Sequence, residues 1–201
     1  MTRLYTALSH SPVILTGFAL RKERGLHMQR TLGIHWIATT HGTWLHGDPR
    51  NSWQHGRLIG PDPFLQASIE KRMQHDAVRL NPTEVLTVAS LIGSVCQSHD
   101  HKVYAATFQP THLHMVFAAL SEDIKSVAAR LKKQTANVVL HVRRKQGDAR
   151  KHLWTQGHFS VFIDSEEHLC NAIDYVREHN QRVDKQADPY DWLTPLGTES
   201  R

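Results

Sequence analysis

The chain has 201 residues, 40% hydrophobic and 21% charged, which is typical of one globular domain with a buried core. Its two cysteines, Cys96 and Cys170, lie in no C-x-x-C pair, so a structural zinc site is not expected. Both fall on apolar faces of predicted helices, where we expect them to be buried. No apolar run is long enough to span a membrane and we find no signal peptide, so a cytoplasmic protein is expected; the formal net charge of +5 is compatible with nucleic-acid binding.

The first part of the chain predicts one strand and a long polar connection. Residues 1–27 show no periodicity and are expected to form a loose or disordered extension before a folded domain over residues 28–185, which residues 186–201 follow as a tail. Residues 32–40 are rich in β-branched and aromatic side chains and predict a strand. The connection that follows is longer than a simple loop requires, and a short helix is expected over residues 65–79.

A helix and two strands come next. Asn81, Pro82 and Glu84 form the pattern of a capping box with proline at the first helical position, and apolar residues then recur at helical spacing. Residues 102–108 and 112–119 predict two strands joined by a short turn, close enough to pair as an antiparallel hairpin.

The rest of the chain adds two helices and a strand. A second amphipathic helix is followed by the basic stretch 141–152, which contains a glycine and predicts a loop. Residues 158–163 predict a fourth strand, and Asp164 and Glu167 then frame a last helix that ends near Asn180. The order of elements predicts an α/β (α+β) fold: a ferredoxin-like βαββαβ antiparallel sheet with helices on one face, plus a C-terminal helix.

The third predicted strand carries two histidines, His112 and His114, that flank one leucine. Side chains alternate across a strand, so both imidazoles lie on one face, with their Cα atoms roughly 6.5–7 Å apart at a rise of ~3.3 Å per residue. That separation suits two ligands of one metal ion. A purely structural histidine pair is the alternative.

The last predicted helix carries a second pair, Tyr175 and His179, whose spacing places both on one side of the helix beside its apolar stripe. His112, His114 and His179 together could hold one divalent cation while Tyr175 attacks a phosphodiester, which leaves a covalent phosphotyrosine and a free 3′-hydroxyl. Each residue alone also has a purely structural explanation. Tyr175 could lie at the edge of the apolar stripe with its hydroxyl in water, and His179 could interact favourably with the helix dipole at the C-terminus. The other histidines, His35 among them, are expected to be ordinary polar residues.

Four segments of the chain match the motifs of one protein family in order and spacing. Thr40–Asp48 is similar to a TYGTWLHGD stretch, and Pro110–Phe117 is similar to the metal motif NHVHLLV. Residues 153–159 precede the last strand, and residues 172–180 are similar to the helix that bears the nucleophile. Over about residues 30–181, the chain therefore resembles the single-tyrosine HUH transposases, the insertion-sequence-200-like and REP-associated tyrosine transposases of bacteria.

The resemblance implies roles for the residues of the two pairs. His112 and His114 would be metal ligands, Tyr175 the nucleophile, and His179 the third ligand, which in relatives is often Gln or Asn. Thr111 stands where relatives usually have Asn. The usual cofactor is Mg²⁺ or Mn²⁺, whereas imidazole ligands alone would favour zinc, copper or nickel. Relatives cut single-stranded DNA next to a hairpin; some are homodimers that supply the tyrosine across subunits, and others act as monomers.

A basic surface is expected to bind this DNA. Its side chains share positive charge, with one aromatic ring suited to stacking on bases: Lys132, Lys133, Arg143, Arg144, Lys145, Arg150, Lys151 and Trp154. A solvated charged face, with Trp154 in the core, is the alternative.

The expected function is that of a metal-dependent single-stranded DNA endonuclease and strand transferase, a transposase with a 5′-phosphotyrosine intermediate, acting at DNA hairpins. Two alternatives stay open. One is a catalytically inactive, domesticated protein that binds structured DNA. The other is a metal-dependent hydrolase that uses water, with Tyr175 as a bystander.

Overall fold

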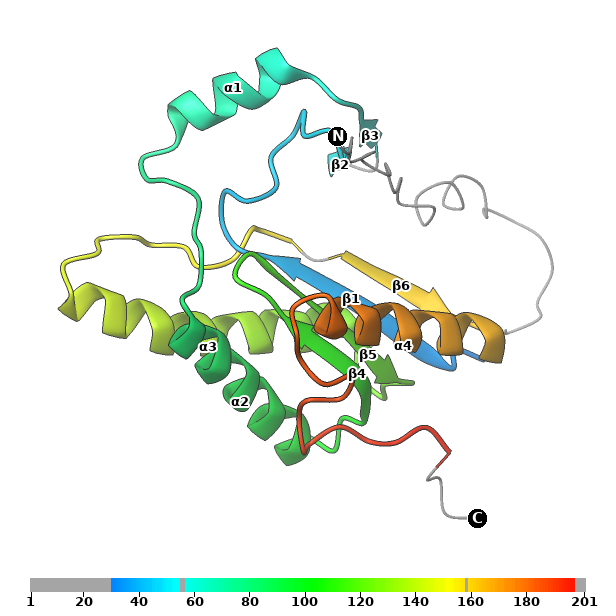
Figure 1. Ribbon diagram of the computed structural model, residues 1–201. Helices are drawn as coiled ribbons and strands as arrows, with labels where there is room; N and C mark the ends of the chain where they lie inside the picture. The colour runs from blue at the N-terminus through cyan, green and yellow to red at the C-terminus, as the bar shows by residue number, and fades with distance from the viewer. Residues whose placement is uncertain (1–29, 55–56, 158, 198–201) are drawn as a thin grey trace, which may run out of the picture.

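A computed structural model describes residues 30–54, 57–157 and 159–197, so the expected extension over residues 1–27 and the expected start of a strand at His158 lie outside the described residues (Figure 1). The main sheet has the order β4-β5-β1-β6 and is entirely antiparallel. Its strands are β1 (Gly33–Thr39), β4 (Val103–Phe108), β5 (His112–Ala118) and β6 (Phe159–Ile163). The three long helices are α2 (Pro82–Ser98), α3 (Ile124–Lys145) and α4 (Glu166–Gln181).

The path of the chain through this sheet is the ferredoxin-like one. Helix α2 connects β1 to β4, the β4–β5 hairpin follows, and helix α3 connects β5 to β6. Strand β5 lies between β4 and β1 and runs antiparallel to both. The predicted βαββαβ antiparallel sheet is confirmed.

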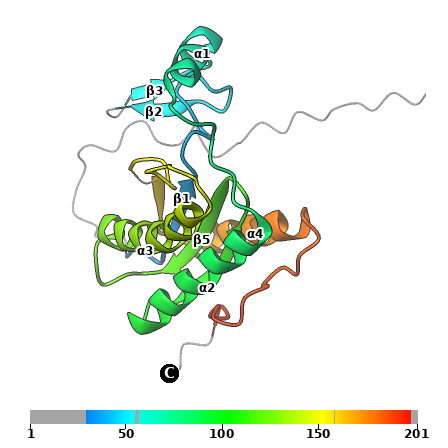
Figure 2. The ribbon, with the colours of Figure 1, turned by 90° about the vertical axis from the view of Figure 1, so that its left-hand side faces the viewer.

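The sheet is covered on both faces, by different helices (Figure 2). Leu113, Met115 and Phe117 of β5 point to the face that packs against α2 and α3. Val116, which has the opposite parity, points to the face that packs against α4. The two crossover helices therefore share one face, as expected, and the C-terminal helix covers the face that carries His112 and His114.

The long connection after β1 forms a small projection beyond the main sheet (Figure 1). It holds a two-stranded hairpin, β2 (Ser52–Gln54) and β3 (Arg57–Ile59), followed by helix α1 (Pro63–Arg72). No residue of α1 is buried, and the side chain of Phe64 is 89% exposed. Asp62 caps α1 by accepting hydrogen bonds from two backbone amides, so this helix begins before the expected residue 65. It ends at Arg72, before the expected end at residue 79.

Three further sequence expectations differ from the structure. Helix α3 continues through Lys145, because the basic residues before Gly147 are good helix formers and favour a helix C-terminus. Ser165, rather than Asp164, caps α4: its hydroxyl accepts from the backbone amide of His168. Cys96 is buried as expected, but Cys170 is exposed.

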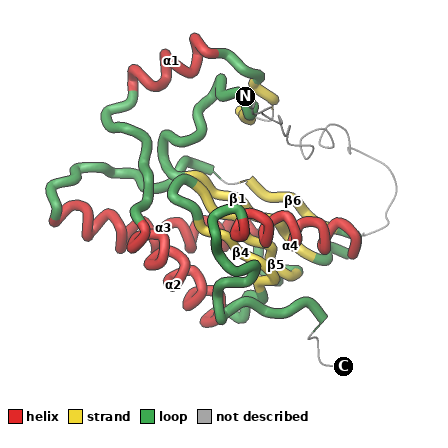
Figure 3. The backbone as a smooth tube through the Cα atoms, viewed as in Figure 1, coloured by secondary structure: helices red, strands yellow, loops and turns green. Residues whose placement is uncertain are grey.

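Residues 182–197, the described part of the chain after α4, lie against the domain although they contain no helix or strand (Figure 3). Tyr190, Trp192 and Leu193 pack on the core formed by α2 and the sheet. A Cβ atom at Gly93 would lie 2.5 Å from the Trp192 indole, so the bare glycine permits this contact. The part of the expected tail that the structure describes is thus packed on the domain. Among the described residues, no helix is both long and apolar enough to cross a membrane.

The start of α2 is joined to the end of α3 by an ion pair. Glu84 completes the expected capping box with Asn81, and its carboxylate also accepts two hydrogen bonds from Arg143, at 2.6 and 2.7 Å. The two side chains are only 12% and 11% exposed. Removal of one partner would therefore leave a poorly solvated charge.

We expect Glu84→Ala to lower the free energy of unfolding by about 2–3 kcal/mol, since it removes both the cap and the partner of Arg143. Glu84→Gln should cost less, because glutamine also serves in a capping box and only the charge is lost. Urea unfolding of the two variants and the wild type measures this. Values for both variants within about 0.5 kcal/mol of the wild type would contradict the assignment.

Candidate active site

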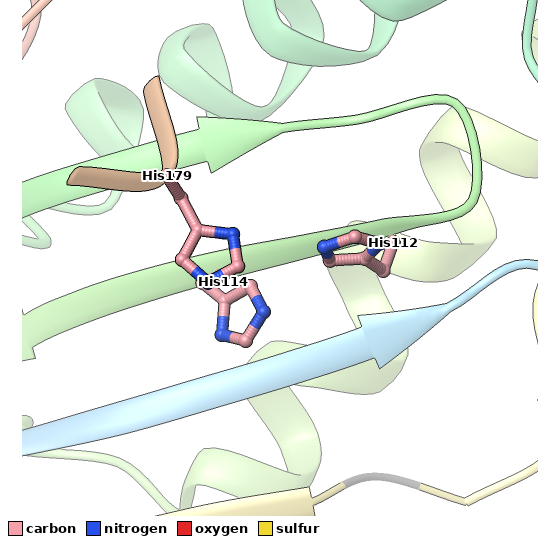
Figure 4. Close-up of side chains that lie close together, drawn as sticks. All are labelled: His112, His114 and His179. Carbon is pink, nitrogen blue, oxygen red and sulfur yellow. The ribbon is translucent and has the colours of Figure 1, made fainter. Parts of the chain in front are cut away.

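Three imidazole rings converge on the face of the sheet that α4 covers (Figure 4). His112 and His114 come from β5, and His179 comes from the last turn of α4. One nitrogen from each ring lies within 4.8 Å of the other two. The ring centroids of His114 and His179 are 5.0 Å apart, and those of His112 and His114 are 5.2 Å apart. The three histidines predicted from the sequence thus form one cluster.

The position of His179 is determined by the packing of α4. Leu169, Ile173 and Val176 bury the apolar side of this helix against the sheet. Next to His179, the fully buried amide of Asn180 donates one hydrogen bond to the carbonyl of Ala106 on β4, at 2.9 Å. Asn180 was not expected to have this role, because a polar residue at a helix end gives no signal of the strand that it contacts.

Burial makes the three imidazoles poor bases. It lowers the pKa of His112 to about 4, and it lowers the pKa of His114 well below the usual value. The pKa of His179 is also lowered, again chiefly by burial. Positive charge nearby adds to the effect of burial, because like charges this close repel each other: His179 and Arg50 act on His112, and the neighbouring imidazoles act on His114. At neutral pH the three rings are therefore uncharged and have lone pairs available for a metal.

This donor set fits a divalent cation. Three convergent neutral nitrogens are the number and type of protein ligand that leave further coordination positions for a substrate. His112, His114 and His179 are the residues that would hold such an ion.

Tyr175 lies beside the cluster, one helical turn before His179. Its ring centroid is 4.6 Å from that of His179 and 5.6 Å from that of His114. The side chain is half-buried, and burial raises the pKa of its hydroxyl above the ordinary value. The tyrosine is consequently a protonated phenol at neutral pH, placed at the edge of the three imidazoles.

His35 of β1 belongs to this site, contrary to the expectation that it is an ordinary polar residue. It is 5% exposed, and its Nε2 lies 3.1 Å from Nδ1 of His114. Its ring also contacts that of Tyr175, with centroids 6.0 Å apart. Burial lowers the pKa of His35 to about 4. The alternation of β1 was a usable signal, since Ile34 and Trp36 face the opposite core.

Thr111 contacts His112, the first histidine of strand β5. Its hydroxyl lies 3.0 Å from Nδ1 of His112. The backbone carbonyl of Thr111 in turn accepts hydrogen bonds from the hydroxyls of Thr40 and Thr43, at 3.1 and 3.2 Å. The segment Thr40–Asp48, which the sequence analysis compared with a family motif, therefore supports β5 at the point where the predicted metal motif begins.

The expected DNA-binding residues all lie on α3 or after it, across the sheet from the three histidines. Some of them are paired within the chain, and the others face solvent. Arg143 pairs with Glu84, Arg150 pairs with Asp148 at 3.3 Å, and Lys132 donates to the carbonyls of Thr155 and Gly157 at 2.5 and 2.6 Å. Burial lowers the pKa of Lys132 to about 8.

Trp154 lies in the core, which is the alternative left open by the sequence. It is 8% exposed, and its indole nitrogen donates to the hydroxyl of Thr135 at 2.9 Å. The basic side chains that face solvent are Lys133, Arg144, Lys145 and Lys151. A cavity of about 410 Å³ between α3 and residues 151–157 is lined in part by Lys133 and Lys151.

Comparison with known proteins identifies the family. The model of the family described as "Transposase IS200 like" matches residues 73–179, more than half of the chain. No curated protein sequence matches. A REP-associated tyrosine transposase bound to a REP hairpin is 12% identical, with a TM-score of 0.48, and the match covers 82% of this chain and 74% of that one. A candidate transposase of Deinococcus radiodurans is also 12% identical, with a TM-score of 0.37, over 79% of this chain and 97% of that one. By the family match, the chain belongs to the IS200-like transposases.

Proposed function

We propose that the chain is a metal-dependent single-stranded DNA endonuclease and strand transferase in which Tyr175 is the nucleophile. The observation that carries this proposal is the position of the Tyr175 ring, 4.6 Å from His179 and 5.6 Å from His114, next to three neutral imidazoles. A phenol and a trio of metal ligands on one patch match the requirements of phosphodiester transfer.

The chemistry of Tyr175 is a transfer at phosphorus. Its hydroxyl oxygen forms a bond to the phosphorus of a DNA phosphodiester, and the bond from phosphorus to the 3′ oxygen breaks. The proton lost by the phenol is matched by the proton that the 3′ oxygen gains. The product is a 5′-phosphotyrosine and a free 3′-hydroxyl, so the phosphoester energy is kept and the step can be reversed to join strands.

The three histidines hold the cofactor. When a divalent cation is bound, Mg²⁺ or Mn²⁺ by analogy with the family that the sequence resembles, it supplies Lewis-acid polarisation of the phosphate. The protein contributes by keeping His112, His114 and His179 unprotonated and by fixing Tyr175 next to them. The raised pKa of Tyr175 keeps the phenol protonated and weakly nucleophilic until substrate is present.

We propose single-stranded DNA beside a hairpin as the substrate. The solvent-facing basic residues of α3 and the loop after it provide a surface for phosphates, whereas Arg143 and Trp154 serve the fold. Tyr175 and the three histidines belong to one chain, and Asn180 fastens α4 to its own sheet. This arrangement supports attack in cis, with one copy of the chain sufficient for cleavage even if a homodimer forms.

We expect Tyr175→Phe to abolish strand cleavage and the covalent protein–DNA adduct while hairpin binding stays within about threefold of wild type, since the phenylalanine lacks only the attacking oxygen. The measurement is incubation with a hairpin-bearing single strand and Mn²⁺, followed by a denaturing gel. Tyr190→Phe is the matched control, because it removes a hydroxyl from a tyrosine packed on the other core, and it should still form the adduct.

Two results would redirect the assignment. Cleavage without any adduct, unchanged in Tyr175→Phe, would favour a hydrolase that uses water. Tight hairpin binding with neither cleavage nor adduct in the wild type would favour a domesticated DNA-binding protein.

The basic surface predicts a steep salt dependence of DNA affinity. Replacing Lys133, Lys145 and Lys151 together by alanine should reduce the slope of log K against log[salt] by about 0.7–0.9 for each phosphate that is no longer neutralised. Lys102→Ala, an exposed lysine just before β4, is the control and should leave the slope unchanged. Fluorescence anisotropy with a labelled hairpin at several salt concentrations gives the slopes. Equal slopes for the triple variant and the wild type would place the phosphates elsewhere.

The lowered pKa values of the trio predict metal binding that persists at mildly acidic pH. Three histidines with ordinary pKa values near 6.5 would together lose about 1,000-fold in apparent affinity between pH 7.5 and 5.5 through proton competition. Because the pKa of His112 is about 4 and those of the other two are also lowered, the loss should be much smaller. Calorimetric titration with Mn²⁺ at both pH values measures it, and a loss near 1,000-fold would show that the rings are not held neutral.

A further inference from the structure

His112 and His114 of strand β5 both have Nδ1 within hydrogen-bond distance of a neighbouring side chain. Nδ1 of His112 contacts the hydroxyl of Thr111 at 3.0 Å, and Nδ1 of His114 contacts Nε2 of His35 at 3.1 Å. In both rings this leaves Nε2 as the nitrogen available to a ligand. A shared pattern of this kind is what a pair of oriented metal ligands requires, since the hydrogen bond at one ring nitrogen decides which nitrogen carries the proton.

His35 reaches His114 because of the strand order. Strands β1 and β5 are neighbours, with His35 opposite Val116 and His114 opposite Ile37 in the register. Both imidazoles point to the face covered by α4, where their ring centroids are 5.3 Å apart. His35 lies outside the trio that can share one cation, and it contacts both a candidate ligand and the ring of Tyr175.

We propose that His35 is a positioning residue: its Nε2 accepts the Nδ1–H of His114 and so keeps Nε2 of His114 unprotonated and turned toward His112 and His179. This inference rests on the proposed metal site and adds a residue to it. The proton of His35 is then on its own Nδ1. Thr111 acts in the same way on His112, with its hydroxyl oxygen as the acceptor.

If His35 served only in packing, position 35 would tolerate different side chains than if His35 orients His114. Burying an imidazole is costly unless its nitrogens are satisfied, and an apolar side chain of similar size would fill the space at lower cost. If His35 only fills space, an isosteric apolar residue should serve as well. If it orients His114, an apolar residue should weaken metal binding while a residue with an acceptor restores it.

Glutamine and methionine provide the matched pair, because they have similar length and volume and only glutamine has a strong acceptor at the end of the chain. We expect His35→Met to weaken Mn²⁺ binding by about 10–100-fold, the usual effect of losing such a hydrogen bond to a metal-bound histidine. His35→Gln should stay within a few-fold of wild type. Calorimetric titration of the full-length chain with Mn²⁺ gives the affinities.

A second measurement reads the proton directly. Long-range ¹H–¹⁵N NMR of the histidine rings, on the metal-free protein, should show His114 protonated at Nδ1 in the wild type and in His35→Gln, with mixed or altered protonation in His35→Met. This result does not depend on DNA cleavage. If His35→Met fails to fold, the NMR comparison of wild type and His35→Gln still decides, because a His114 protonated at Nε2 in either protein overturns the inference.

The outcomes separate this inference from the proposed function. His112→Ala should abolish Mn²⁺ binding at the site. If His112→Ala does so and His35→Met binds Mn²⁺ as tightly as wild type, the role of His35 is wrong and the metal site stands. If the wild type and His112→Ala bind Mn²⁺ equally, the metal site itself is wrong.

Discussion

The chemistry of this molecule depends on how helix α4 docks on the sheet. The helix buries Leu169, Ile173 and Val176 on the face that bears His112 and His114, and the amide of Asn180 ties its last turn to the backbone of β4. A shift of one residue along this interface would rotate Tyr175 and His179 by about 100° away from the strand histidines. The apolar packing of α4 therefore sets the distance between Tyr175, the proposed nucleophile, and the three histidines, although none of the packed residues takes part in the proposed chemistry.

The same burial determines the charge state of the site. It lowers the pKa of His35 and His112 to about 4 and raises the pKa of Tyr175, so the histidines are neutral and the phenol is protonated at neutral pH. Neutral imidazoles bind a cation without first losing protons, and a protonated phenol is a weak nucleophile. Under the proposed mechanism, such a protein could take up a cation at neutral pH, while its protonated phenol would react only slowly with phosphates in the absence of substrate.

Residues that lie close in sequence were predictable, and contacts between distant strands and helices were not. The alternation of β5 predicted that His112 and His114 share one face, and helical spacing predicted that Tyr175 and His179 share one side of α4, because each pair is a local geometric consequence of its own element. His35 was missed because its contact with His114 follows from strand order and register, which no local pattern contains. Arg143 was likewise predicted to bind DNA, because no local pattern shows that α2 and α3 pack together and place Arg143 next to Glu84.

The central claim is that one cation sits among His112, His114 and His179 with Tyr175 facing it, and a crystal of the protein grown with Mn²⁺ tests it most directly. Anomalous diffraction at the manganese edge should show one strong peak within coordination distance of the three histidines, with the Tyr175 hydroxyl on the open side of the ion. A peak bound by other side chains, or Tyr175 turned away from an ion held by the trio, would contradict the account.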